Sequence, residues 1–220
     1  RIAVLDGAMG TMVHALGLDE AGFRGTAFRD HPRDLKNCID VLSLTQGEAI
    51  RGIHAAYLEA GADIVRVSCP DEDSTAAFRT IAKAAKVPLV ADIHFHYRRG
   101  IEAAEAGAAC LRINPGNIGG DDKVAEVVTA AKKAGIPMRI GANGGSLPKH
   151  LEDLAAEDQA EALVEAALEE VRLLEKLDYR DFKISVKSSH VPTMIRAYRM
   201  LAAKVPYPLH LGVTEAGPPS

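Results

Sequence analysis

Residues 105–120 read EAGAACLRINPGNIGG and contain one complete transition from helix to strand to loop. The glycine in EAG is typical of the residue that ends a helix. A short apolar strand follows, interrupted by Arg112 and Asn114, and a Pro-Gly-Asn turn ends it. A strand with polar side chains near its C-terminal end, followed by a glycine-containing loop, is typical of the edge of a parallel α/β sheet where binding sites form.

The same transition recurs along the chain. A glycine again precedes a predicted strand in EAGAD (59–63) and in KKAGIP (132–137). Strands are predicted at residues 1–7, 62–69, 87–95, 109–114, 136–143, 181–189 and 207–215. Helices are predicted at residues 46–60, 72–86, 98–107, 121–134, 155–177 and 190–204. This alternation predicts an α/β fold with right-handed βαβ units and a parallel sheet.

Two architectures have this order of elements, a doubly wound sheet and a (β/α)8 barrel. Polar residues follow nearly every predicted strand, as in barrels, whereas a doubly wound sheet concentrates its site near one switch point. We therefore predict a single domain of the TIM-barrel type over residues 1–220.

The number of strands is one short of a closed barrel. We recognise seven strands, and the seventh lies at the end of the sequence. We expect the last βα unit to be missing or supplied otherwise, which would leave open edges for self-association. DVLSLT (40–45) is the one spare strand candidate. Residues 17–45 are too long for a simple connection and are expected to form a lid or a packed surface excursion.

Three predicted strands carry an arginine in a similar position: Arg66 in IVRVS, Arg112 in CLRIN and Arg139 in PMRIG. An unpaired charge buried in a parallel strand costs several kcal/mol. Either each arginine pairs with its own structural carboxylate, or the three share one anionic ligand. The planar guanidinium suits bidentate binding of phosphate, and three similar placements favour the shared anion.

Two loops after these strands are rich in glycine and asparagine. NPGNIGG (114–120) and GANGGS (141–146) place Asn114, Asn117, Asn143 and backbone N–H groups where ligand oxygens could be held. Ordinary turn chemistry is the alternative for each loop taken alone. In the next strand, Lys183 and Lys187 share one face, and one of them is a candidate for a further cation.

Acid–base candidates lie at two strand ends. Asp92, His94 and His96 alternate in ADIHFH, and His210 and Glu215 belong to the seventh predicted strand. A carboxylate that faces arginines stays ionised unless burial raises its pKa. A metal site at the two histidines of ADIHFH would need a third ligand, so no metal site is assigned.

Composition excludes several classes of function. The 220-residue chain has a formal net charge of −4 and no basic tract, so we expect no binding to nucleic acid. No apolar run approaches the roughly 20 residues that cross a bilayer. No signal segment opens the sequence, and we expect a cytoplasmic protein that does not bind membranes. Cys38, Cys69 and Cys110 lack the close spacing of zinc or iron–sulfur ligands.

From about residue 64 to its end, the sequence resembles the barrel domain of 4-hydroxy-3-methylbut-2-enyl diphosphate synthases. That family of isoprenoid biosynthesis reductively opens a cyclic diphosphate, 2-C-methyl-D-erythritol 2,4-cyclodiphosphate. The resemblance rests on the motifs VRVSCPD, VADIHFHYR, LRINPGNIG, MRIGANGGSL, KISVKSS and LHLGVTEAG. It implies that Arg66, Arg112 and Arg139 hold the diphosphate.

The same resemblance implies roles for five further residues. Lys187, Asn143 and His94 are expected to line the substrate pocket. Asp92 and Glu215 are expected to lie near the reacting carbons. The family's cluster domain, whose cysteines hold a 4Fe–4S cluster, has no counterpart in this sequence. We therefore expect no cofactor in this chain and no turnover by the chain alone.

Residues 1–63 resemble a different family, the start of the homocysteine-binding barrel of cobalamin-dependent methionine synthase. The motifs are VLDGAMGTM, FRGTAFRDHPRDLKNCIDVLSLTQ and IHAAYLEAGADI. The zinc-binding cysteines of that family do not follow, so methyl transfer is not expected. The two resemblances meet at AGADIV (60–65), a motif that both barrels share, which suggests an engineered or natural joining of two barrel fragments.

Three hypotheses follow from these resemblances. In the first, the chain is a catalytically incomplete barrel that still binds a small-molecule diphosphate. In the second, it is a structural chimera of two barrel fragments without activity. In the third, it is a homocysteine-binding remnant of methionine synthase.

Overall fold

The computed structural model of the chain describes residues 4, 5, 7 and 9–212. The chain divides into two compact units, Arg1–Arg66 and Val67–Ser220. The boundary lies three residues after the position where the two sequence resemblances meet. Each unit has its own buried apolar residues.

The first unit is helical. Its elements are α1 (Met9–Ala15), α2 (Glu20–Arg24), the 3-10 helix η1 (Ile39–Val41), α3 (Leu42–Thr45) and α4 (Gly47–Glu59). Its core is formed by Val13, Phe23, Leu35, Leu42 and Ile53. Because three of these five residues belong to the stretch 17–45, that stretch is a packed part of the unit.

The long connection between α2 and η1 is folded around one side chain. Arg24 pairs with Glu20, with 2.6 Å between the guanidinium and carboxylate atoms. The same guanidinium donates hydrogen bonds to backbone carbonyls of the connection, those of Phe28, Arg29, His31 and Arg33. A charge-assisted hub of this kind replaces the regular backbone hydrogen bonds that a loop lacks.

The spare strand candidate at 40–45 does not form a strand, because these residues are helical. Leu42 is fully buried whereas Leu44 is 72% exposed. A strand would place both side chains on one face, since its side chains alternate with a period of two. The Thr45 hydroxyl donates to the Val41 carbonyl, one helical turn earlier, and to the Phe23 carbonyl.

The second unit contains a parallel sheet with the strand order β1-β2-β3-β4-β5. The strands are β1 (Val65–Ser68), which spans the boundary between the units, β2 (Leu89–Asp92), β3 (Cys110–Arg112), β4 (Met138–Ile140) and β5 (Phe182–Ile184). Strand order follows chain order, with a helix after each strand, so the architecture is α/β of the TIM-barrel type.

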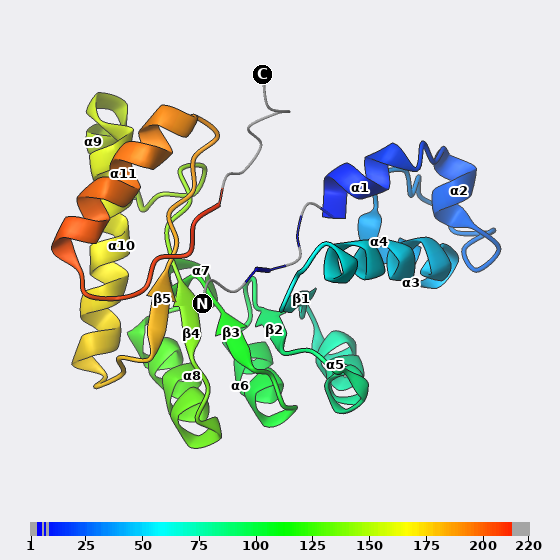
Figure 1. The fold of residues 1–220 in the computed structure, drawn as a ribbon, viewed down its shortest axis with the longest axis horizontal. Coiled ribbons are helices and arrows are strands. Elements are labelled where there is room, and N and C mark those ends of the chain that lie inside the picture. The colour runs from blue at the N-terminus through cyan, green and yellow to red at the C-terminus, as the bar shows by residue number, and fades with distance from the viewer. Residues whose placement is uncertain (1–3, 6, 8, 213–220) are drawn as a thin grey trace. The chain divides into compact units, whose positions relative to one another are not determined.

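The helices of the second unit follow the strands in turn (Figure 1). They are α5 (Glu72–Ala84), α6 (Tyr97–Glu105), α7 (Pro115–Ile118), α8 (Asp121–Ala134), the 3-10 helix η2 (Lys149–Leu151), α9 (Glu152–Glu157), α10 (Gln159–Lys176) and α11 (Val191–Lys204). The packed helix pairs are α5 with α6, α6 with α8, and α10 with α11. In the part of the chain that the structure describes, no helix is long and apolar enough to cross a membrane.

Most predicted helices are confirmed to within a few residues. The exception is the helix predicted at 155–177, which is broken at Asp158 into α9 and α10. The Asp158 carboxylate accepts hydrogen bonds from the N–H groups of Ala160 and Glu161 and so caps the second helix.

The first predicted strand, 1–7, and the seventh, 207–215, lie partly outside the described residues, and their described parts form isolated bridges instead of continuous strands. Leu5 forms a single bridge with Ile64, and Leu209 forms a single bridge with Ile184. Val4 is 51% exposed and Leu211 is 68% exposed, so these apolar side chains are not packed into a core. Pro208 also lacks the N–H that a continued strand would donate.

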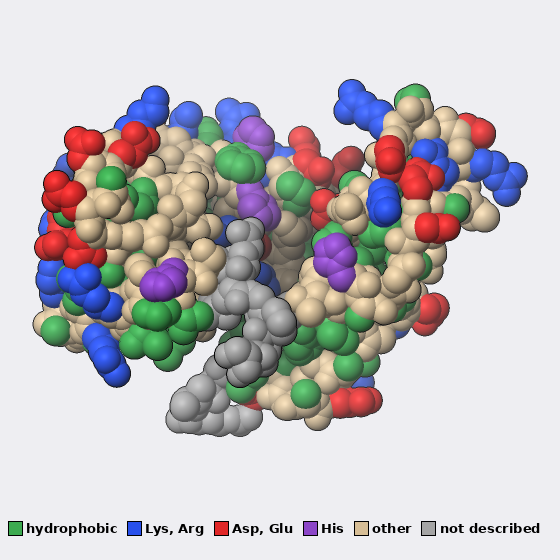
Figure 2. Space-filling view, turned by 90° about the horizontal axis from the view of Figure 1, so that it is seen from above, with side chains coloured by type: hydrophobic (Ala, Val, Ile, Leu, Met, Phe, Trp, Pro, Cys, Tyr) green, Lys and Arg blue, Asp and Glu red, His purple; other side chains and the backbone are tan. Residues whose placement is uncertain are grey.

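The surface of α9–α11 carries both signs of charge, and Figure 2 shows red and blue side chains intermixed along that side of the molecule. Arg196 pairs with Asp158 at 2.6 Å, and Arg172 pairs with Glu165 at 2.8 Å. Neighbouring charges on these helices therefore offset one another.

Gly141, directly after β4, has a φ of 152°. A Cβ atom at this position would overlap the carbonyl oxygen of Ser185 in the segment after β5. Glycine is therefore required here both for its backbone conformation and for the close approach of two backbones.

We expect Gly141→Ala to lower the free energy of unfolding by about 3 kcal/mol or more, because backbone atoms must move to admit the methyl group. Urea denaturation followed by circular dichroism measures this loss. The matched control is Gly135→Ala at the end of α8, where φ is 65° and the added carbon meets no atom within 4 Å. That change should cost only about 1 kcal/mol; equal losses in the two variants would contradict the prediction.

Candidate functional site

Two adjacent rows of residues cross the sheet in register. Ala91, Leu111, Met138 and Phe182 are paired across β2–β5, and all four are buried. One residue further along each strand, the row consists of charged residues, Asp92, Arg112, Arg139 and Lys183. Successive side chains point to opposite faces of a sheet, so the charged row lies on the face opposite the apolar row. We call these four residues the charged row.

The best-defined contact of the charged row is the ion pair of Asp92 and Arg112. Arg112 Nη1 lies 2.7 Å from Asp92 Oδ1. The side chains are only 11% and 21% exposed. Arg112 Nε is buried and has no hydrogen-bond partner among the described residues. The pair fixes one end of the guanidinium and leaves a donor for another group.

The row holds three cations against one carboxylate. Arg139 is 5% exposed, and Lys183 lies beside it in register. The row itself therefore holds more positive than negative charge, and the carboxyl group of Glu170, outside the row, also interacts with Arg139 and Arg112.

The next polar positions of β4 and β5 extend the charged row towards the loops. Asn143 and Lys187 form an isolated parallel bridge. Asn143 Oδ1 accepts a hydrogen bond from the Gly145 N–H at 3.2 Å. Beside them lies a cavity of about 370 Å³, lined by Asn143, Gly144, Gly145, Ser146, Gln159, Ser188 and Ser189.

His94 follows β2 and is partly buried. Its Nδ1 atom lies 3.4 Å from the Ser68 hydroxyl, and its ring contacts that of Phe95. His96 is exposed and precedes α6. Among the described residues, no group of three His, Cys, Asp or Glu side chains could hold a metal ion.

Four other predicted site residues are not members of the charged row itself. Asn114 and Asn117 line a cavity described below, to which neither Arg112 nor Arg139 contributes among the described residues. His210 donates its N–H to the Ile184 carbonyl and accepts from the Tyr198 hydroxyl through its own carbonyl. Arg66 is the last residue of the first unit. Glu215 lies outside the described residues.

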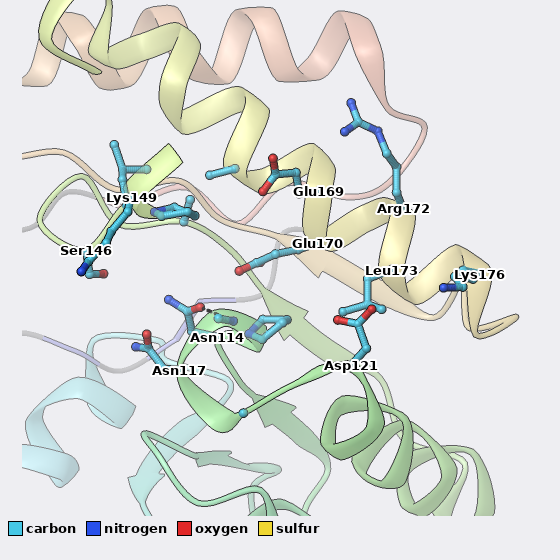
Figure 3. Close-up of a pocket in the computed structure, with 17 residues that line it drawn as sticks. Asn114, Asn117, Asp121, Ser146, Lys149, Glu169, Glu170, Arg172, Leu173 and Lys176 are labelled. Carbon is cyan, nitrogen blue, oxygen red and sulfur yellow. Dashed lines mark hydrogen bonds between the residues drawn. The ribbon is translucent and has the colours of Figure 1, made fainter. Parts of the chain in front are cut away.

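The larger cavity has a volume of about 620 Å³ and lies between α7, the loop after β4 and α10 (Figure 3). We call it the α10 cavity. Pro115, Ala142, Leu147, Ala166 and Leu173 supply apolar wall. Polar and charged side chains complete its lining, namely Asn114, Asn117, Asp121, Ser146, Lys149, Glu169, Glu170, Arg172 and Lys176.

Glu170 is the unusual member of this lining. Its carboxyl group points from α10 towards Asn114 (Figure 3), and its Oε2 atom is buried without a hydrogen-bond partner among the described residues. Burial raises the pKa of Glu170 to about 8, although a hydrogen bond from the Gly141 N–H and the charges of Arg139 and Arg112 act in the opposite direction. The carboxyl group is therefore largely protonated at neutral pH.

Sequence reasoning missed Glu170, although the sequence holds a signal for it. Leu163, Ala167, Glu170 and Leu174 recur at spacings of three and four, which define the buried stripe of a helix. A carboxylate on such a stripe is out of place unless a partner or a ligand meets it.

The geometry defines a class of protein, an α/β protein of the barrel type with a charged row beside the C-terminal ends of its strands. Two known families match the chain. The GcpE TIM-barrel domain matches residues 44–220, and Homocysteine S-methyltransferase matches residues 3–68. The chain belongs to the GcpE TIM-barrel domain family.

Similar proteins carry one shared name, 4-hydroxy-3-methylbut-2-en-1-yl diphosphate synthase (flavodoxin). That of Caulobacter vibrioides is 62% identical over 159 residues, which cover 72% of this chain and 42% of that protein. That of Rhodospirillum rubrum is 55% identical over 188 residues, covering 86% and 49%. The chain thus spans about half the length of the curated relatives it matches.

One solved structure, of a 2,3-dimethylmalate lyase, is similar to the chain with a TM-score of 0.50 and 16% identity. The match covers 75% of this chain and 62% of that protein. At this identity the likeness is one of fold.

We expect Asp92→Asn to lower the free energy of unfolding by about 1.5–3 kcal/mol, because the charge-assisted bond to Arg112 is lost in a largely buried setting. Chemical denaturation measures the effect. The control is Glu165→Gln, which breaks the more exposed pair with Arg172 and should cost about 0.5 kcal/mol. A loss from Asp92→Asn no larger than that of the control would refute the assignment of a strong pair.

Glu170 should make stability depend on pH. Its pKa is raised from an ordinary value of 4.5 to about 8, so the folded state retains a proton that the unfolded state releases. The contribution of Glu170 to the free energy of unfolding is largest below about pH 4.5 and falls as the pH rises towards 8. Above about pH 8 this contribution no longer changes. Unfolding measured from pH 5 to 8.5 should show this fall in the wild type and a smaller one in Glu170→Gln. Identical pH profiles would show that Glu170 titrates normally.

Proposed function

We propose that the second unit binds a diphosphate on the charged row. The single observation that carries the proposal is the register of Arg112, Arg139 and Lys183 across three adjacent strands, with Asp92 fixing the first arginine. The names of the relatives, which specify a diphosphate synthase, support the same class of ligand.

The chemistry of the row suits a diphosphate. The guanidinium groups of Arg112 and Arg139 present planar donors that phosphate oxygens accept in pairs. Asp92 holds Arg112 in place before the ligand arrives, which reduces the entropy lost on binding. The buried Nε atom of Arg112 then gains an acceptor.

Further residues complete the proposed site around the organic part of the ligand. Lys187 and Asn143 extend it along β4 and β5, and His94 lies at the end of β2. In this proposal Asp92 and Glu215 lie near the reacting carbons, and Arg66, Asn114, Asn117 and His210 are ligand contacts. The proposed ligand is the cyclic diphosphate 2-C-methyl-D-erythritol 2,4-cyclodiphosphate.

The chain's own cysteines do not fit an iron–sulfur cluster. Cys69 and Cys110 are buried. Burial raises the pKa of Cys110, and it raises that of Cys69 to about 12, with nearby Asp92 adding to the effect at Cys69. Cluster ligation needs accessible thiolates, so we assign no electron-transfer step to these residues. We propose a cytoplasmic chain that binds substrate without turning it over, and that self-associates through open sheet edges.

We also infer that the chain joins parts of two barrel families. Both families match residues 44–68, and the boundary of the two compact units falls within that overlap. This supports a joint at a shared structural position. The first segment would then contribute helical structure, with homocysteine binding as its alternative role.

Calorimetric titration tests the proposed ligand. We expect the cyclic diphosphate and inorganic pyrophosphate to bind, and Arg112→Ala to weaken both by at least about tenfold, because it removes a cation and leaves Asp92 facing the anion. Arg196→Ala, an exposed arginine of α11, should leave the affinity unchanged.

Two results would overturn the proposal. One is the absence of heat with both diphosphates, and the other is equal affinity in the wild type and Arg112→Ala. Stabilisation against heat by homocysteine but not by pyrophosphate would favour the homocysteine-binding role instead.

A further inference from the structure

We propose that the α10 cavity is a second ligand site, next to the charged row, for a short molecule with a hydrogen-bond donor at one end and an anionic group at the other. Its volume of about 620 Å³ lies in the range of small-molecule sites. Its walls combine apolar residues with a few polar groups, as such sites do. The proposal does not depend on diphosphate binding.

The donor end of the ligand is assigned from Glu170. Glu170 is one of the lining residues, and its Oε2 atom is buried and has no hydrogen-bond partner among the described residues. A buried acceptor without a hydrogen bond costs about 1–3 kcal/mol, so a ligand donor at this point would gain a well-defined contact. Figure 3 shows the carboxyl group directed towards Asn114, across the space between α10 and α7.

Asn114 and Asn117 add polar groups beside this end. Asn114 Oδ1 already accepts a hydrogen bond from the Gly116 N–H at 3.1 Å, which leaves the amide NH₂ group as the donor. Asn117 is exposed and lies next to it in the lining (Figure 3). The arrangement offers both an acceptor and donors to a ligand that carries hydroxyl or amine groups.

The anionic end is assigned from the lysines of the lining. Two other charged members are already paired, Arg172 with Glu165 and Glu169 with His150, each at 2.8 Å. Lys149 and Lys176 are exposed and make no ion pair within the described part of the chain. The two lysines lie on opposite sides of the lining, Lys149 beside Ser146 and Lys176 on the side of Asp121 (Figure 3). We assign the anionic group of the ligand to the Lys149 side, away from the Asp121 carboxylate.

Two donor chemistries meet these requirements, a hydroxyl group and a protonated amine. A hydroxyl donates to Glu170 in either protonation state, whereas an ammonium group needs the carboxylate. Since the pKa of Glu170 is about 8, an ammonium ligand should bind more tightly as the pH rises from 6.5 to 8.5. The charged groups around Glu170 and the cavity are Arg112, Arg139, Glu169, Asp121, Lys149, Arg172 and Lys176.

The experiment titrates the full chain with glycerol 3-phosphate and, separately, with phosphoethanolamine, and follows amide chemical shifts by NMR. We expect saturable shifts at Gly116, Gly119 and Ser146, with dissociation constants of roughly millimolar order. For whichever probe binds, Glu170→Leu should lower the affinity by at least about tenfold, because it removes the acceptor. The matched control is Glu161→Leu, the same substitution at an exposed position of α10.

Arg112→Ala separates the two sites. It should weaken pyrophosphate binding by at least about tenfold and leave the saturable shifts at Gly116, Gly119 and Ser146 in place, so failure of one proposal does not imply failure of the other. Because the charge of Arg112 lowers the pKa of Glu170, its loss should move the pH dependence of phosphoethanolamine binding to higher pH. If Glu170→Leu does not fold, Glu170→Gln replaces it. That variant keeps an acceptor and should retain the hydroxyl probe, but it should lose the gain in phosphoethanolamine affinity at high pH.

The proposal is overturned if neither probe gives saturable shifts up to about 10 mM. It is equally overturned if the Glu170 variants bind both probes as the wild type does, or if the shifts map to the charged row instead of the cavity lining. Binding of glycerol 3-phosphate alone identifies a hydroxyl ligand, and pH-dependent binding of phosphoethanolamine identifies an amine.

Discussion

The structure of the second unit depends on placing charge inside a parallel sheet. Such strands are normally apolar on both faces, because helices cover one face and a barrel interior the other. Here the row after the apolar Ala91, Leu111, Met138 and Phe182 is charged at every position. Within the row Asp92 is the one carboxylate, and it pairs with Arg112. The carboxyl group of Glu170, on α10, also interacts with the charges of Arg139 and Arg112. The sheet therefore keeps its buried charges by placing carboxyl groups near them.

The predictability of the fold from sequence varied with the strength of the local signals. Helices with a capping residue and a clear apolar stripe, such as α5 and α8, were predicted almost to the residue. The strand segments near the chain ends have the same apolar alternation as the real strands, yet they form single bridges. Alternation describes what a residue prefers, whereas a strand also needs a neighbour along its whole length. That neighbour is not encoded within the segment.

The candidate site shows the same division. Arg112 and Arg139 could be recognised because a charge in an apolar strand is locally anomalous, and they lie in register in the sheet. Asn114 and Asn117 belong to the same loop, yet they line the α10 cavity. Nothing in the sequence indicated this cavity, because its other wall comes from α10, about fifty residues further along the chain. Glu170 lies on α10, which carries several other glutamates. From sequence alone it is therefore hard to distinguish from a solvent-exposed carboxylate.

The contacts of Arg24 in the first unit have a consequence for sequence change. The guanidinium holds the connection after α2 through main-chain carbonyls of Phe28, Arg29, His31 and Arg33. Every amino acid has such a carbonyl, so the side chains of these four positions are not what the hub recognises. Substitutions at the exposed Arg29 and Arg33 should therefore preserve the path of the backbone, whereas Phe28 also packs against the core of the first unit. The contacts themselves depend on the guanidinium group of Arg24 and on the carboxylate of Glu20 that pairs with it. The sequence of the connection is therefore less constrained than these two residues.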